Sequence, residues 1–116
     1  SVTTPTLIAD DFFQTDAVLG HGVSLDELPA LDTIAGLMRL NGEVVGHGTG
    51  RDILGHPAEG LVWLANLLHR RGQICPPGTV VLLGSIVSTQ WLDPDGGPVD
   101  VTVEMEGLEK VEARFD

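Results

Sequence analysis

The pair Asn41–Gly42, placed between two apolar stretches, is the feature that most constrains the fold of this chain. Both residues tolerate positive φ, so the pair favours the tight turn of a two-residue β-hairpin. Counting outward from the turn gives the cross-strand pairs Leu40 with Glu43, Met38 with Val45, and Gly36 with His47. Glycines at 36, 46 and 48 lie inside these strands, which predicts a bulge or the close approach of another backbone.

Residues 57–71 follow with the pattern of a helix. Pro57 suits the first helical position, and Arg70 and Arg71 suit the C-terminal turn. Trp63 and Leu67 extend the apolar stripe to a second face. A helix that is apolar on more than one side is buried on more than one side, which suggests a further neighbour or a subunit contact.

Three later segments read as strands. Residues 79–87 form a continuous apolar β run, which predicts a central buried strand. Residues 99–105 and 110–115 alternate between apolar and polar, and a loop at 107–109 would pair Met105 with Val111 and Val103 with Ala113. We therefore expect one α+β domain over residues 1–116, mostly β, with one central helix. A chain of 116 residues is long enough for a single core.

The charge excludes several functions. The chain has 17 acidic and 6 basic residues, for a net charge of −11, so nucleic acid and anionic membrane surfaces are poor partners. The one cysteine, Cys75, cannot form an intramolecular disulfide, and no signal-peptide pattern is present. These features favour a reduced, cytoplasmic setting.

Few residues indicate chemistry on their own. Structural roles are favoured for the histidines, with His56 as a helix cap and His47 the least certain. Glu104 and Glu106 share a strand face and could hold a metal. A solvated face on which they pair with Lys110 and Arg114 explains them better. The adjacent acids Asp10 and Asp11 fit either a turn or a site.

Gly84 and Ser85 end the predicted central strand, where a backbone N–H and a hydroxyl could hold a carboxylate. On spacing alone this signal is weak, and the serines of the chain lack the pattern of a catalytic nucleophile elbow.

Seven blocks in order resemble one family. They are IAD (8–10), VLG (18–20), NGEVVGHGTG (41–50), ILGHP (53–57), WLAN (63–66), PGTVVLLGS (77–85) and GLEKVEARF (107–115). The sequence resembles the fumarylacetoacetate hydrolase superfamily, in its branch of 2-keto-4-pentenoate hydratases and 4-oxalocrotonate decarboxylases. The resemblance covers nearly all of this chain but only about the C-terminal half of the family's usual chain.

The resemblance implies a mixed β-roll with short helices, and enzymes of aromatic meta-cleavage catabolism that act on small 2-oxo acids. It also implies a divalent cation, Mg²⁺ or Mn²⁺, acting as a Lewis acid. The family's metal-binding glutamates and its lysine lie upstream of the matched region, and Lys110 is not that lysine. The matched site positions are Asp10, which would orient water or substrate, and Gly84 and Ser85, which would hold the substrate carboxylate.

Other positions depart from the family. Phe12, Phe13 and Leu83 stand where the family carries small or hydroxyl residues, which would fill the pocket. We therefore expect the C-terminal part of a 2-oxo acid hydratase that needs an N-terminal half. The alternatives are a 4-oxalocrotonate decarboxylase-like subunit and a non-catalytic binding or scaffolding paralogue. The partner would be the missing half, a homo-oligomer or a catalytic paralogue.

Overall fold

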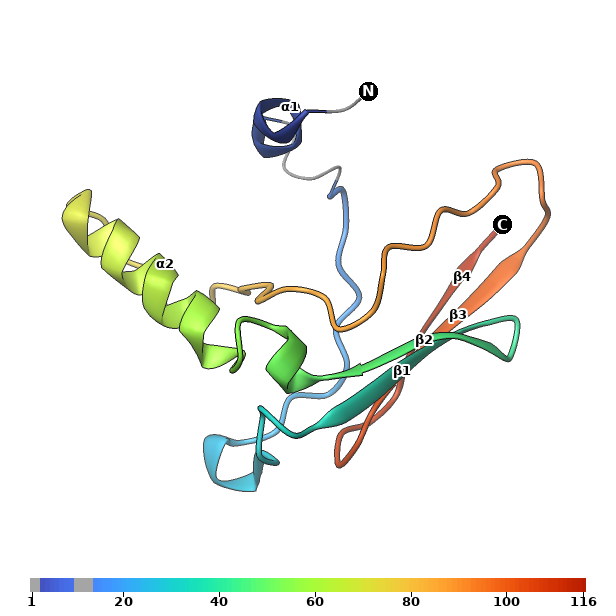
Figure 1. The fold of residues 1–116 in the computed structure, drawn as a ribbon, viewed down its shortest axis with the longest axis horizontal. Coiled ribbons are helices and arrows are strands. Elements are labelled where there is room, and N and C mark those ends of the chain that lie inside the picture. Colours follow the sequence, from blue (N-terminus) through green and yellow to red (C-terminus); the bar gives the residue numbers. More distant parts are fainter. Residues whose placement is uncertain (1–2, 10–13) are drawn as a thin grey trace.

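A computed structural model describes residues 3–9 and 14–116. Its helices and strands, in chain order, are α1 (Thr4–Ala9), the 3-10 turn η2 (Leu25–Glu27), β1 (Ala35–Leu40), β2 (Glu43–Thr49), the 3-10 turn η3 (Gly50–Asp52), α2 (Ala58–Arg70), β3 (Val99–Met105) and β4 (Val111–Phe115). The strands form one antiparallel sheet in the order β2-β1-β3-β4 (Figure 1). This arrangement confirms the predicted α+β class, mostly β, with one main helix.

The hairpin of β1 and β2 turns where the sequence predicted. Asn41 has φ 49° and Gly42 has φ 85°, so both residues use the backbone region that this turn requires. The Asn41 side chain also accepts a hydrogen bond at 2.9 Å from the backbone N–H of Asp100, at the start of β3. The turn is thereby held against the neighbouring strand as well as between its own two strands.

The predicted register of this hairpin is correct only next to the turn. Leu40 faces Glu43 and Arg39 faces Val44, as expected, but the register then shifts between Arg39 and Met38. The remaining pairs are Met38 with Gly46, Leu37 with His47, Gly36 with Gly48, and Ala35 with Thr49. The predicted pairs of Met38 with Val45 and of Gly36 with His47 are therefore wrong. A β-bulge at Val45 places one extra residue in β2 and moves every later pair by one.

As predicted, the glycines inside β1 and β2 mark a place where another segment of the chain crosses the sheet at close distance. A Cβ added to Gly48 would lie 2.2 Å from the carbonyl oxygen of Ile86, and one added to Gly46 would lie 3.1 Å from Cβ of Val87. On Gly36 it would lie 2.2 Å from Cδ1 of Ile86. The segment around Ile86 and Val87 thus rests directly on one face of β1 and β2.

In the second hairpin, formed by β3 and β4, the connecting loop is longer than predicted, and the apolar residues pair differently. Val103 faces Val111 and Val101 faces Ala113, so the predicted pairs of Met105 with Val111 and of Val103 with Ala113 are wrong by two residues. The backbone N–H of Glu106 donates to Ala35 O at 2.8 Å, and that of Leu108 donates to Met105 O. These bonds take the residues after Met105 into a wider turn. A shift of two keeps each side chain on its predicted face.

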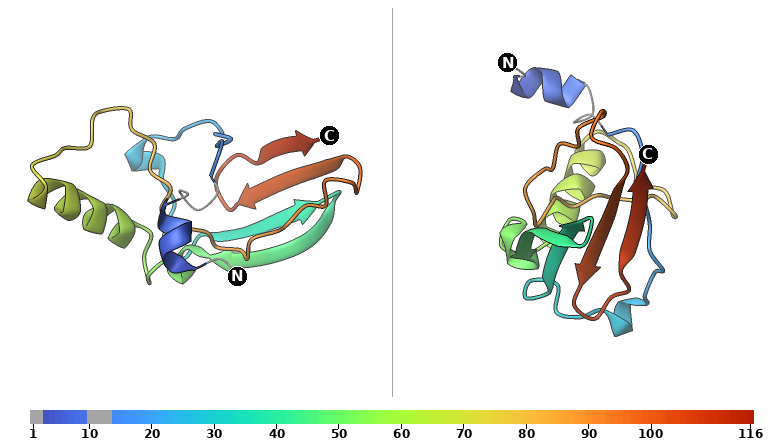
Figure 2. Two further views of the ribbon diagram at one scale, coloured as in Figure 1. Left: turned by 90° about the horizontal axis from the view of Figure 1, so that it is seen from above. Right: turned by 90° about the vertical axis from the view of Figure 1, so that its right-hand side faces the viewer.

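The main helix α2 begins and ends close to the predicted limits. His56 caps it, because the backbone N–H of Ala58 donates to His56 Nδ1 at 3.1 Å. The helix extends away from the sheet (Figures 1 and 2), and none of its residues is buried. Trp63 is 61% exposed, so the second apolar face anticipated from the sequence has no cover within the described residues.

The prediction of a central buried strand at 79–87 is wrong for this structure. The segment carries no strand assignment, and Val80 and Leu82 are 56% and 62% exposed. A strand requires backbone partners at its edges, and the sheet ends at β2 and β4 without including this segment. Its apolar pattern is that of a strand whose neighbours are absent from the described chain.

Candidate functional site

Of the three residues assigned to a site from the sequence, Asp10 is outside the described residues. Gly84 and Ser85 are exposed, in the segment that leads from the end of α2 to the crossing at Ile86. Gly84 has φ 138°, a conformation that an L-residue rarely adopts, and a Cβ at this position would lie 3.3 Å from Cγ2 of Ile53. The backbone geometry therefore favours glycine here, and Ile53 leaves little room for a side chain.

The hydroxyl of Ser85 already has local partners. Its Oγ donates to Val87 O at 2.6 Å and accepts from the backbone N–H of Val87 at 3.3 Å. A carboxylate that bound here would have to take the place of Val87 O as the acceptor. Since the hydroxyl rotates freely, this exchange needs only a change of its hydrogen position.

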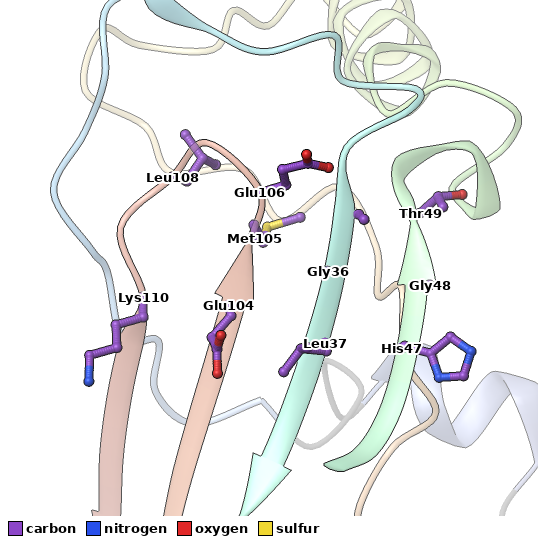
Figure 3. A pocket seen from close by; sticks show the side chains of 11 residues that line it. Gly36, Leu37, His47, Gly48, Thr49, Glu104, Met105, Glu106, Leu108 and Lys110 are labelled. Atoms are coloured by element: carbon purple, nitrogen blue, oxygen red, sulfur yellow. The ribbon is translucent and has the colours of Figure 1, made fainter.

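A pocket of about 550 Å³ lies elsewhere, on the sheet (Figure 3). The register places Leu37, His47 and Glu104 on the face opposite the crossing of Ile86 and Val87. Lys110 completes the row of side chains that Figure 3 shows across the sheet. The other lining residues are Ala35, Gly36, Gly48, Thr49, Met105, Glu106 and Leu108. Neither Gly84 nor Ser85 lines this pocket, so the structure does not bring them together with it.

The charges of the pocket are paired in a different way from the prediction. Arg39 Nε donates to Glu104 Oε1 at 2.9 Å, and Lys110 Nζ donates to Glu112 at 2.8 Å. The expected pairing of Glu104 and Glu106 with Lys110 and Arg114 is therefore wrong in its partners, although the face is salt-bridged. The hydrogen bond that Lys110 donates to Glu112 raises the pKa of Lys110, and the charge of Glu104 raises it further. Lys110 is thus held as a cation and is unsuited to act as a nucleophilic amine.

The divalent metal implied by the resemblance does not fit the described residues. No group of three or more His, Cys, Asp or Glu side chains that could hold a metal ion occurs in residues 3–9 and 14–116. Mg²⁺ in proteins takes carboxylate and other oxygen ligands in near-octahedral geometry. The carboxylate of Glu104, which lines the pocket, is already paired with Arg39.

Comparisons with known proteins define the relatives of the chain. It is 36% identical over 110 residues to the 4-oxalocrotonate decarboxylase of Pseudomonas putida. The aligned region covers 95% of this chain and 40% of that protein. It is 35% identical over 99 residues to 2-keto-4-pentenoate hydratase 2 of Dechloromonas aromatica, covering 83% of this chain and 35% of the relative. No protein-family model matches the chain.

A solved structure shows the same fold. The 4-oxalocrotonate decarboxylase from Pseudomonas putida G7, complexed with magnesium and adipate, matches with a TM-score of 0.70 and 41% identity. The match covers 80% of this chain and 34% of that one, and the same enzyme is also known complexed with calcium and acetate. Divalent cations and carboxylates therefore bind to this relative.

These matches bear out the resemblance to the fumarylacetoacetate hydrolase superfamily, of which the chain corresponds to a C-terminal part. Within it, the similarity is to the branch of 4-oxalocrotonate decarboxylases and 2-keto-4-pentenoate hydratases. The chain spans well under half the length of these relatives. No helix within the described residues is long and apolar enough to cross a membrane.

Sequence reasoning found part of the pocket and missed the rest. His47, Glu104 and Lys110 were considered from the sequence, whereas the apolar lining by Leu37, Met105 and Leu108 was not expected. The predicted register placed His47 opposite Gly36, and the bulge places it opposite Leu37 instead. The glycines of β2 were the available signal for that bulge.

Proposed function

We propose that this chain supplies the carboxylate-holding part of an enzyme that acts on small 2-oxo acids, in the hydratase and decarboxylase branch. The observation that carries the proposal is the backbone of Gly84 next to the Ser85 hydroxyl, in a chain 41% identical to a carboxylate-binding relative. Both residues are exposed, and no backbone hydrogen bond of the described residues uses their amides. A hydroxyl beside free N–H groups suits an anionic oxygen.

In this proposal each site residue has a defined role. The Ser85 hydroxyl turns its hydrogen from Val87 O to a carboxylate oxygen, while the Val87 N–H continues to hold Oγ in place. Gly84 keeps its left-handed backbone so that the adjacent amides stay open to the same carboxylate. Asp10 orients a water molecule or the substrate, by its match to the family.

We infer that the remaining parts come from a region equivalent to the upstream portion of these relatives. The relatives are more than twice as long as the region matched here, and the described residues provide no metal cluster. That region supplies the ligands for Mg²⁺ or Mn²⁺. The completed enzyme is either a hydratase or a decarboxylase. The decarboxylase alternative has the longer match, 95% of this chain against 83%.

The test joins the chain to the upstream portion of the Pseudomonas putida decarboxylase, by coexpression, with Mg²⁺ present. We expect decarboxylation of 4-oxalocrotonate or hydration of 2-hydroxypentadienoate, which neither polypeptide performs alone. Ser85→Ala should raise KM about tenfold or more, because a carboxylate loses a charge-assisted hydrogen bond. Ser88→Ala removes an exposed serine three residues further on and should leave KM within about twofold.

The same assay addresses the non-catalytic alternative. Leu83, one of the residues expected to fill a pocket, lies with Cδ2 3.8 Å from the position of a Cβ on Gly60 in α2. A stable complex that turns over neither substrate would instead support a binding or scaffolding paralogue.

A further inference from the structure

The peptide that joins Ile86 to Val87 makes contacts at both of its polar ends. Its N–H, from Val87, donates to Ser85 Oγ at 3.3 Å, and Ser85 Oγ in turn donates to Val87 O at 2.6 Å. Its carbonyl oxygen, from Ile86, lies 2.2 Å from the position that a Cβ on Gly48 would occupy, and its carbonyl carbon lies 3.2 Å from that position. One peptide therefore links the Ser85 hydroxyl to strand β2.

The planarity of the peptide bond makes this link stiff. The C=O and the N–H of one peptide lie close to a common plane, and departures of more than about 10–15° are costly. A displacement of the Ile86 carbonyl therefore moves the Val87 N–H with it. At Gly48 the nearest atom is backbone, so no side-chain rotation relieves a clash there. At Gly36 the nearest atom is Cδ1 of Ile86, at 2.2 Å, which a change of rotamer moves away.

The strand side of this contact is held more firmly than the crossing segment. Gly48 faces Gly36 in the ladder between β1 and β2. The next residue, Thr49, donates its backbone N–H to Asp52 Oδ2 at 2.7 Å. Residues 84–87 carry no strand assignment and are not part of the sheet. A side chain added at position 48 would therefore displace the peptide of the crossing segment rather than the strand.

We propose that Gly48 is a positioning residue for the Ser85 hydroxyl. The missing side chain lets the peptide between Ile86 and Val87 rest on β2, and the Val87 N–H then holds Ser85 Oγ in the orientation that serves a carboxylate. The inference rests on the proposed function, because it states how the same carboxylate site is held. Gly48 acts through this peptide and does not itself contact the carboxylate.

Steady-state kinetics of the chain coexpressed with the upstream portion of the Pseudomonas putida decarboxylase, with Mg²⁺ present, tests the proposal. Gly48→Ala should raise KM about threefold to tenfold, because a hydrogen bond to the carboxylate is weakened. It should leave kcat within about twofold, since this bond is made to substrate and transition state alike. A loss of folded enzyme would lower the apparent kcat instead, because KM does not depend on the enzyme concentration.

Two further alanine variants calibrate this effect. Gly36→Ala, which meets only the end of the Ile86 side chain, should raise KM less than Gly48→Ala does. Gly22→Ala is the matched control, because its Cβ would meet nothing within 4 Å, and it should keep KM within about twofold. A KM for Gly48→Ala equal to that of the Gly22→Ala control would overturn the proposal.

Combination with Ser85→Ala separates an effect through the hydroxyl from a general disturbance. In a chain that already lacks the hydroxyl, Gly48→Ala should raise KM no further, because both changes remove the same hydrogen bond. Additive effects of the two substitutions would contradict a role through Ser85. If Gly48→Ala does not fold, Gly46→Ala replaces it in the same comparison as a milder change, because its Cβ would lie 3.1 Å from Cβ of Val87.

An NMR measurement on the chain alone distinguishes a failure of this inference from a failure of the proposed function. Ser85→Ala should shift the amide resonance of Val87, and should shift it much less when Gly48→Ala has already weakened their hydrogen bond. An inactive wild-type assembly with this difference overturns the proposed function and supports the positioning of the hydroxyl. An active wild-type assembly with equal shifts in both backgrounds overturns the role of Gly48 and leaves the proposed function standing.

Discussion

Replacing Gly48 with alanine tests the close packing of the 84–87 segment against the sheet. The new Cβ would lie 2.2 Å from Ile86 O and 2.9 Å from Asp52 Oδ2. Both contacts are more than roughly 0.5 Å inside ordinary van der Waals distance, and the first is with backbone. Asp52 Oδ2 also accepts a hydrogen bond at 2.7 Å from the N–H of Thr49, which the displacement would weaken.

The expected size of the effect follows from two opposing contributions. Overpacking costs about 1–3 kcal/mol, whereas alanine restricts the unfolded chain and returns about 0.4–1 kcal/mol. The net loss of about 1–2 kcal/mol should lower the urea midpoint by roughly 1 M, followed by far-UV circular dichroism. Gly22→Ala is the matched control, because its Cβ would meet nothing within 4 Å and its φ is not in the left-handed region. Equal midpoints for the two variants would refute the crossing.

Three further predictions concern local contacts. Asn41→Ala loses a residue suited to positive φ and the acceptor for the Asp100 N–H, and should lower the free energy of unfolding by about 1–2 kcal/mol in thermal melts. The hydrogen bond from Arg51 holds the pKa of Asp32 below its ordinary value of 3.8, so its stabilisation is present above that value and is lost as the pH falls through the lowered pKa. Arg51→Ala should raise this pKa in an NMR titration, and an unchanged value would contradict the pairing. His56→Ala should cost about 0.5–2 kcal/mol by uncapping α2, while His56→Asn restores an acceptor and most of that loss.

Local signals predicted the elements that depend on local chemistry. The turn at Asn41, the helix that begins after Pro57 and the cap from His56 each need only a few neighbouring residues, and the structure contains all three. The predicted strand faces of the second hairpin are also correct, since side-chain alternation survives a shift of two residues. The resemblance to the decarboxylase and hydratase branch was identified from ordered blocks, and the solved relative with a TM-score of 0.70 bears it out.

Register and pairing could not be predicted, because they depend on contacts across the sheet. The bulge at Val45 moves His47 from Gly36 to Leu37, so that both side chains line the pocket. The partner of Glu104 was sought on β4, but Arg39 on β1 reaches it diagonally. The assignment of Gly84 and Ser85 to a carboxylate site, and of Asp10 to catalysis, stays a prediction.

The strand predicted at 79–87 and the exposed helix α2 have one physical explanation. Of the described large apolar residues, Ile34 is buried at 4% exposure, whereas Trp63 and Leu82 are more than half exposed. Apolar patterns of this kind are typical of buried elements, because exposed positions tolerate polar residues at little cost. The pattern and the exposure agree if the helix face and the strand edges are covered by the rest of the fold, of which this chain spans 34% in the solved relative. In that case the free energy of unfolding measured on these residues alone is smaller than that of the whole fold, because the apolar side chains stay in water.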